Sequence, residues 1–259
     1  MRNHANLFFL FRQLLGRELA SRYRATTLGA FWLVLQPLLM LVVYTLVFSG
    51  IFKIRWGGAT SASFALVLFA GLIVFNFFAE VLVSSPALVT SQPNYVKKVV
   101  FPVELLAVVR VAAAAFSACV GVAILFFAQL AIEGLPSPWF LLAPLVLLTM
   151  LPMLLGVAWL VSALGVYLQD IAQVAGVIAS VMLFVSPIFF PASAMPPKMA
   201  MLIHLNPLVL PMEQLRLMTV QNAPPDGAAL AVHFAASCLF AFLALKAFRR
   251  LSRGFADVL

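Results

Sequence analysis

The chain has 259 residues, of which 64% are hydrophobic and only 9% are charged, and its mean hydropathy is +1.12. A soluble domain of this length needs more polar surface to cover its core, so the composition excludes an ordinary water-soluble fold. The net charge of +8 would suggest nucleic acid in a soluble protein. Here, however, the basic residues cluster at the two termini and in one internal loop, as in the cytoplasmic segments of membrane proteins. We therefore expect an all-α membrane protein with no nucleic-acid partner.

The first expected element is an amphipathic helix over residues 5–24. Its leucines and phenylalanines fall on one side of the helix, opposite Gln13, and arginines flank them, which is typical of a helix that lies on a membrane surface and contacts lipid. Glu18 and Arg22 project onto the apolar side. Their i,i+4 spacing lets them pair, and they are also candidates for contact with a protein partner.

Six apolar segments follow, each long enough for the roughly 20 helical residues that cross a bilayer. They cover residues 31–52, 63–84, 105–132, 139–167, 171–190 and 228–248. If the N-terminus is in the cytoplasm, the basic clusters at both termini and the lysines of the loop near residue 97 all lie on the cytoplasmic side. We expect six transmembrane helices in a single domain over residues 1–259, with both termini in the cytoplasm.

Two connecting segments are neither tight turns nor spans. Residues 85–102 are polar and contain three prolines, with room for a short cytoplasmic helix over 94–101. Residues 191–227 are moderately apolar but are broken by repeated prolines, which prevent one continuous helix. Short re-entrant or interfacial helices are the natural interpretation of the second segment.

The residue types needed for chemistry are largely missing. No HExxH motif, close carboxylate pair, Cys/His cluster or GxxxxGK[ST] phosphate loop occurs, so we expect no catalytic site, no metal site and no cofactor in this chain. Glu80 and Arg110 lie near the cytoplasmic ends of the second and third spans. A structural ion pair of Arg110 with Glu80 or Glu104 is the expected use of these charges.

Four motifs, in chain order, resemble polysaccharide-exporting ABC transporter permeases, the membrane subunits that export O-antigen, teichoic acid and related polymers. The first is the run RYRATTLGAFW at residues 22–32, followed by Gln36-Pro37 and YTLVFS at 44–49. The second is YVKKVVFP at 95–102. The third is Gln169-Asp170-Ile171, where glutamine replaces the family's usual arginine. The fourth comprises Ser186-Pro187-Ile188, Asn206-Pro207 and Arg216.

This resemblance covers residues 7–250 and implies a permease of the bacterial inner membrane. Such permeases form homodimers that pair with two copies of a separate ATP-binding subunit, which holds ATP and Mg. A channel along the dimer interface carries a lipid-linked polysaccharide from the cytoplasm to the periplasm.

The resemblance and the residue patterns together suggest three sets of functional residues. The ATP-binding subunit is expected to contact a coupling helix, with Tyr95 as anchor and charged residues around it, and the set is Tyr95, Lys97, Lys98, Phe101, Glu18 and Arg22. Aromatic faces that suit sugar C–H surfaces are expected to line the channel, and this set is Trp32, Tyr44, Phe48, Phe75, Phe77, Phe184 and Phe189. The periplasmic gate is expected to contain Pro187, Asn206, Pro207, Glu213 and Arg216, with Glu213 and Arg216 paired on one helical face.

Three other functions remain open at this level. An ABC permease for a drug or small lipid would have resistance genes as neighbours, in place of glycosyltransferase genes. A membrane transferase acting on lipid-linked sugars would need clustered carboxylates, which the sequence does not supply. A structural scaffold would not stimulate ATP hydrolysis in a reconstituted complex.

Overall fold

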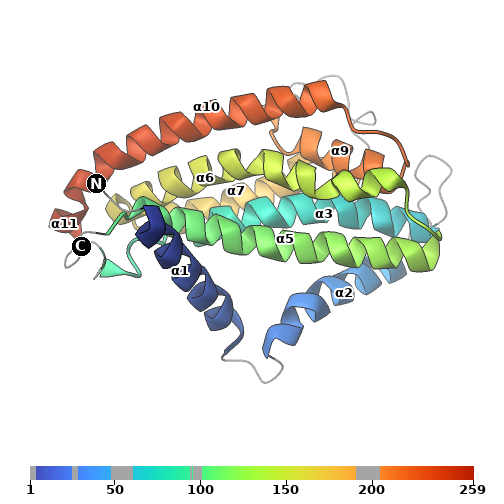
Figure 1. Cartoon of the computed structure of the whole chain (residues 1–259), viewed down its shortest axis with the longest axis horizontal. Coiled ribbons are helices and arrows are strands. Elements are labelled where there is room, and N and C mark those ends of the chain that lie inside the picture. The colour runs from blue at the N-terminus through green and yellow to red at the C-terminus, as the bar shows by residue number, and fades with distance from the viewer. Residues whose placement is uncertain (1–3, 25–28, 48–60, 94, 96–100, 191–204) are drawn as a thin grey trace.

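The computed structural model describes residues 4–24, 29–47, 61–93, 95, 101–190 and 205–259, and all regular elements in these ranges are helices (Figure 1). Four helical stretches within them are long and apolar enough to cross a membrane. They contain α3 (Ser61–Ser84), α5 (Glu104–Ile132), α6 (Ala143–Tyr167, preceded by the 3-10 helix η3, Pro138–Leu142) and α10 (Gly227–Leu251). These helices match four of the expected spans within a few residues.

The other two expected spans are shorter. The first corresponds to α2 (Trp32–Thr45, 14 residues), and residues 48–52 of its expected range lie outside the described residues. The second corresponds to α7 (Ile171–Val185, 15 residues), which ends five residues before the expected boundary at 190. The reason is Pro187: the residue before a proline is disfavoured in the helical region, and Ser186 is extended, with φ −79° and ψ 145°. At 1.5 Å per residue, α7 extends about 22 Å, less than the roughly 30 Å of a bilayer core.

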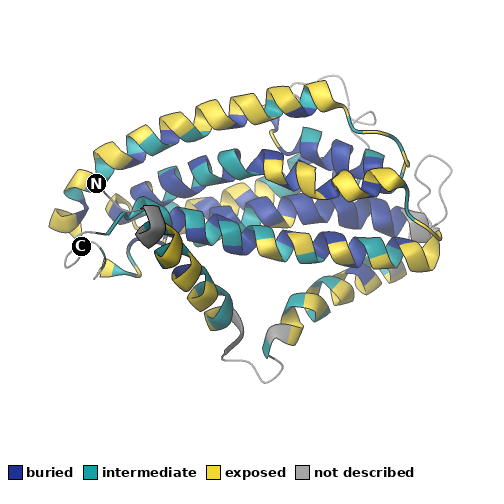
Figure 2. Ribbon diagram, viewed as in Figure 1, coloured by how far each residue is buried: buried dark blue, intermediate teal, exposed yellow. Residues whose placement is uncertain are grey.

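Helix α3 occupies the centre of the bundle. Its apolar stretch is 78% buried, and it packs against α2, α5, α6, α7 and α9. By contrast, α10 packs mainly on α6 and is exposed along its outer face, as Figure 2 shows. An exposed helix with a mean hydropathy of 2.2 needs an apolar solvent, so the chain is a multi-pass membrane protein.

The N-terminal helix α1 (His4–Arg24) confirms the helix expected over 5–24. It leaves the bundle at the end where α11 (Phe255–Val258) also lies (Figure 1). Leu14 is buried against the bundle, whereas Phe8 and Phe9 are exposed. The expected coupling helix over 94–101 falls mainly on residues 94 and 96–100, which lie outside the described residues.

A short helix lies in the described part of the segment where short helices were expected. Helix α9 (Val209–Thr219) lies against α3, α6, η3 and α10, while residues 191–204 lie outside the described residues. The next helix, α10, is capped by the preceding Asp226, whose Oδ1 accepts a hydrogen bond from the backbone N–H of Ala229 at 3.0 Å. This is the side-chain cap that satisfies one of the free N–H groups at a helix start.

The end of the chain folds back onto α6. After α10, the 3-10 helix η6 (Ser252–Gly254) turns the chain so that Phe255 is fully buried against the rings of Phe248 and Tyr167. The Tyr167 hydroxyl donates to the backbone carbonyl of Leu251 at 2.7 Å. The C-terminal residues are thereby attached to the α6–α7 turn.

The loop after α3 approaches α6 so closely that only glycine fits at position 165. A Cβ atom there would collide with the backbone carbonyl of Pro86, which cannot rotate away as a side chain would. We expect Gly165→Ala to lower the free energy of unfolding by about 1–3 kcal/mol, the usual cost of overpacking, seen as a lower thermal midpoint in detergent. Gly176→Ala in α7 is the matched control, because nothing lies within 4 Å of its Cβ position. Equal midpoints for the two variants would contradict the close approach.

Candidate functional site

A cavity lies between α2, α3 and α5. It has a volume of about 600 Å³. One face of α2 forms a wall, since Trp32, Gln36, Met40 and Tyr44 recur at every fourth residue, the spacing that aligns side chains along a helix. Opposite it lie Phe69, Leu72, Ile73, Asn76, Phe77, Ala79 and Glu80 of α3, and Arg110, Ala114, Ser117, Ala118 and Gly121 of α5. The pocket therefore combines aromatic and aliphatic surface with amide, hydroxyl and ionisable groups.

The pocket contains three of the expected channel-lining residues: Trp32, Tyr44 and Phe77. The others are dispersed. Phe75 is buried in the core, Phe189 packs against the core, and Phe184 is 69% exposed on α7. Phe48 lies outside the described residues. The described members of the expected set do not form one continuous surface within this single chain, and the role of the set in a channel stays a prediction.

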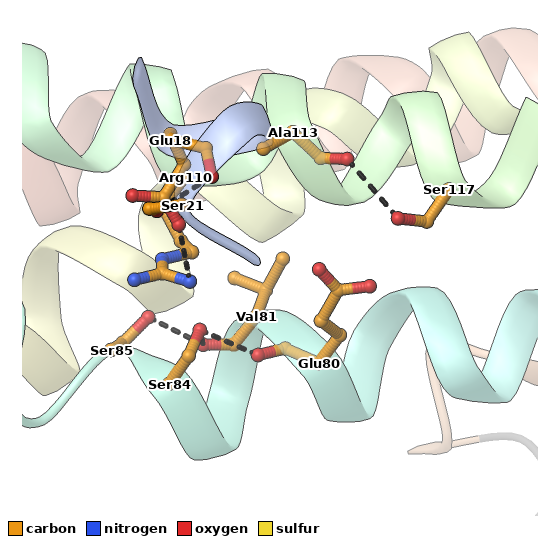
Figure 3. Close-up of polar contacts among 9 residues, drawn as sticks. All are labelled: Glu18, Ser21, Glu80, Val81, Ser84, Ser85, Arg110, Ala113 and Ser117. Atoms are coloured by element: carbon orange, nitrogen blue, oxygen red, sulfur yellow. Dashed lines mark hydrogen bonds and ion pairs between the residues drawn. The ribbon is translucent and has the colours of Figure 1, made fainter. Parts of the chain in front are cut away.

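The charged residues of the pocket lie at the end nearest α1. The Arg110 guanidinium reaches from α5 toward α1, where its Nη1 atom is 2.8 Å from Oε1 of Glu18, and Figure 3 shows Glu80 rising from the neighbouring α3. Glu104 lies 3.5 Å from Arg249 of α10. Sequence reasoning missed Glu18 as a partner of Arg110, because nothing in the spacing shows that α1 turns back onto α5. The pairing of Glu18 with Arg22 stays a prediction, since the Arg22 side chain lies outside the described residues.

A second contact joins α1 to the loop that follows α3. Arg17 Nη2 donates to Oε1 of Gln92 at 3.2 Å, and the Arg17 guanidinium lies over the Tyr95 ring, 5.9 Å from its centroid. The Tyr95 ring lies 4.6 Å from that of Phe101, so these two expected contact residues are neighbours. Lys97 and Lys98 lie outside the described residues.

At the other end of the bundle, Arg216 of α9 is only 5% exposed. Its guanidinium donates to three backbone carbonyls: Nε to Val67 at 3.0 Å, Nη1 to Pro187 at 2.6 Å and Nη2 to Ile188 at 2.9 Å. A planar guanidinium presents its donors in a fixed fork, which allows this threefold contact. These carbonyls, and not the expected partner Glu213 alone, determine where the Arg216 side chain lies.

The other expected gate residues lie in the segments that Arg216 joins or next to them. Pro187 supplies one of the three carbonyls. Asn206 is buried; its Nδ2 donates to Oγ of Ser186 at 2.9 Å, and its Oδ1 accepts from the N–H of Leu208. The Pro207 carbonyl lies 3.2 Å from Nε2 of His233. Glu213 is half-buried on α9. The structure thus brings this predicted set together, although its gating role is a separate matter.

Glycine at position 71 allows Arg216 to enter. A Cβ on Gly71 would lie 2.6 Å from Nη2 of Arg216. No sequence pattern identified this pairing, because residues 71 and 216 belong to helices far apart in the chain.

We found no group of three or more His, Cys, Asp or Glu residues that could hold a metal ion within the described part of the chain. The pocket between α2, α3 and α5 offers apolar, aromatic, hydrogen-bonding and ionisable groups, a mixture that suits the binding of a ligand.

Short or discontinuous helices beside long apolar spans are a feature of many membrane transporters. The profile of the ABC-2 type transporter family matches residues 9–219, and the chain belongs to this family. It is 24% identical over 250 residues to the O-antigen export system permease protein RfbA of Myxococcus xanthus. The matched region covers 96% of this chain and 94% of that protein. It is also similar to an O-antigen export system permease protein RfbA of Klebsiella pneumoniae, 23% identical over 99% of this chain and 97% of the relative.

The contact between Gly71 and Arg216 can be tested by a double-mutant cycle. We expect Gly71→Ala to displace the guanidinium from Ile188 and to lower the free energy of unfolding by about 1–3 kcal/mol, measured as thermal or denaturant stability in detergent. In an Arg216→Met background the added methyl group meets a flexible side chain. The loss of unfolding free energy caused by Gly71→Ala should then be well under half of its value in the unmodified protein. An equal cost in both backgrounds would show that Gly71 is required for another reason.

Proposed function

We propose that this chain is the membrane-spanning subunit of an ATP-driven exporter that moves a lipid-linked polysaccharide from the cytoplasm to the periplasm. The observation that carries the proposal is similarity over nearly the whole chain to permeases named for O-antigen export, together with the family match. A family of ABC transporter permeases implies an ATP-binding partner subunit. We propose two copies of each subunit, with ATP and Mg held by the partner and no cofactor in this chain.

The proposed topology has six spans in the bacterial inner membrane with both termini in the cytoplasm. The alternation of α3, α5, α6, α7 and α10 along the bundle is compatible with it, because α1 and α11 then lie at the same end (Figure 1). In this orientation the α3–α5 loop faces the cytoplasm and α9 lies in the periplasmic half. The short α2 and α7 would complete the six spans.

The pocket supports a carbohydrate-containing substrate by its chemistry. Trp32 and Tyr44 present aromatic faces with polar atoms, a combination that offers apolar contact and hydrogen bonding together. Asn76, Gln36 and Ser117 add amide and hydroxyl groups on the walls. A hydrated polymer that must move along a path is best served by many weak contacts of this kind.

A deletion strain tests the substrate. Without this chain, we expect lipid-linked glycan to accumulate on the cytoplasmic side and the surface polymer to disappear, because synthesis continues while export stops. Glycan analysis of membrane extracts, before and after complementation, is the measurement. Normal surface glycan combined with sensitivity to a toxic compound would instead identify a permease for a drug or small lipid.

The buried arginine suggests a test of the periplasmic gate. We propose that the region around α9 closes the empty channel, and that Arg216 holds it closed by joining α9 to α3 and to the chain after α7. Arg216→Ala should raise ion conductance of the idle transporter in lipid vesicles several-fold, because three carbonyls lose their donor.

Arg253→Ala is the matched control, since Arg253 is exposed in η6 at the opposite end of the bundle. Unchanged conductance of Arg216→Ala in a correctly assembled complex would leave α9 as a static cap without a gating role.

A further inference from the structure

Two consecutive residues of α1 contact two different parts of the molecule. Arg17 contacts Gln92 and Tyr95 in the loop after α3, and Glu18 contacts Arg110 in α5. Neighbouring residues of a helix point about 100° apart, since a turn takes 3.6 residues. One helix can therefore hold the loop on one side and α5 on the other.

The body of α1 is fixed between the same two elements. Leu14, one turn before Glu18, is buried, and a small cavity beside it is bounded by Leu88 and Gln92 from the loop and by Leu106, Val109 and Arg110 from α5. Apolar packing of Leu14 and the two polar contacts thus act at one place. The position of α1 is defined relative to both elements, in contrast to its exposed Phe8 and Phe9.

The Tyr95 ring is held from two directions. Phe101 lies 4.6 Å away on one side, and the Arg17 guanidinium lies 5.9 Å from the ring centroid. Arg17 also contacts Gln92, whose backbone carbonyl accepts from the N–H of Tyr95 at 3.1 Å. Arg17 is therefore attached both to the ring and to the turn that carries it.

We propose that Arg17 is a positioning residue for the ATP-binding subunit: it orders Tyr95 before docking, while Glu18 anchors α1 to α5 at the pocket. This rests on the proposed function, in which a separate ATP-binding subunit docks on the chain, and on the expected role of Tyr95 as the anchor for that subunit. A preorganised aromatic anchor gains affinity because less conformational freedom is lost on binding. Through Glu18, a shift of the docked loop also reaches Arg110, which borders the pocket.

The test measures the affinity of the cognate ATP-binding subunit for the purified full-length permease in nanodiscs. Arg17→Gln should weaken binding about five- to tenfold, as expected for loss of one charged hydrogen bond and one cation–π contact at a partly exposed site. Arg12→Gln is the matched control, because Arg12 is exposed on the same helix and the substitution removes the same charge. Arg12→Gln should leave the affinity unchanged.

A cycle with Tyr95→Ala separates positioning from general stability. If Arg17 acts through Tyr95, Arg17→Gln in a Tyr95→Ala background should weaken binding of the ATP-binding subunit by less than a further factor of two. Full additivity would overturn the proposal. Should Arg17→Gln fail to give a monodisperse permease, Arg17→Lys replaces it, with an expected loss of two- to threefold because the charge remains but the planar fork does not.

The outcomes distinguish this inference from the proposed function. An unmodified permease that binds no ATP-binding subunit contradicts the function itself. No effect of Tyr95→Ala overturns the docking site and, with it, the role of Arg17. A strong effect of Tyr95→Ala with equal affinities for Arg17→Gln and Arg12→Gln overturns the positioning role alone. For Glu18→Gln we expect the amount of glycan exported per ATP hydrolysed to fall several-fold, whatever the change in the rate of hydrolysis, and an unchanged ratio would overturn the anchoring role.

Discussion

The threefold contact of the Arg216 guanidinium fixes one end of this molecule. Where the chain leaves α7 at Pro187, the helical pattern stops, and the carbonyls of Pro187 and Ile188 would face an apolar interior without donors, which is costly. Arg216 supplies both donors and a third to Val67 of α3. A buried cation also needs polar partners, so each side satisfies the other. Helix α9, the end of α7 and the central α3 are consequently joined at one point.

The shortness of α7 follows from the same feature. Pro187 forces the preceding Ser186 out of the helical region, so its side chain is free to accept from Asn206. Asn206 in turn accepts a hydrogen bond at Oδ1 from the N–H of Leu208, which forms a turn directly before α9. Irregular backbone is tolerated at membrane depth only when protein or a water-filled cavity surrounds it. The buried Ser186, Pro187 and Asn206 fulfil that condition.

The sequence predicted the long helices well because apolar length alone determines them, and α5 begins and ends within one residue of its expected range. Prediction from the sequence was less successful where contacts between distant helices determine the ends of elements and the partners of side chains. The end of α7 was placed too late, although Ser186-Pro187 carried the signal. The three carbonyl partners of Arg216, the space at Gly71 and the ion pair of Glu18 with Arg110 depend on helices distant in the chain. Spacing rules report only neighbours on one helix, so they could not reveal these contacts.

Helix α3 connects the two ends, since Val67 and Gly71 meet Arg216 while Glu80 lies beside Arg110 at the pocket. Its burial makes it the part of the bundle most costly to displace, because in lipid the helices are held by packing and hydrogen bonds. Helix α2 is the opposite case: Leu41 is its one buried residue among those described, and Trp32, Met40 and Val42 are exposed. Moving α2 therefore breaks the fewest packed contacts of any wall of the pocket. A change in pocket width is accordingly cheapest by displacement of α2 against a fixed α3 and α5. Helix α1, the α-helix before α2 in the chain, is held by the same Arg110 that borders the pocket.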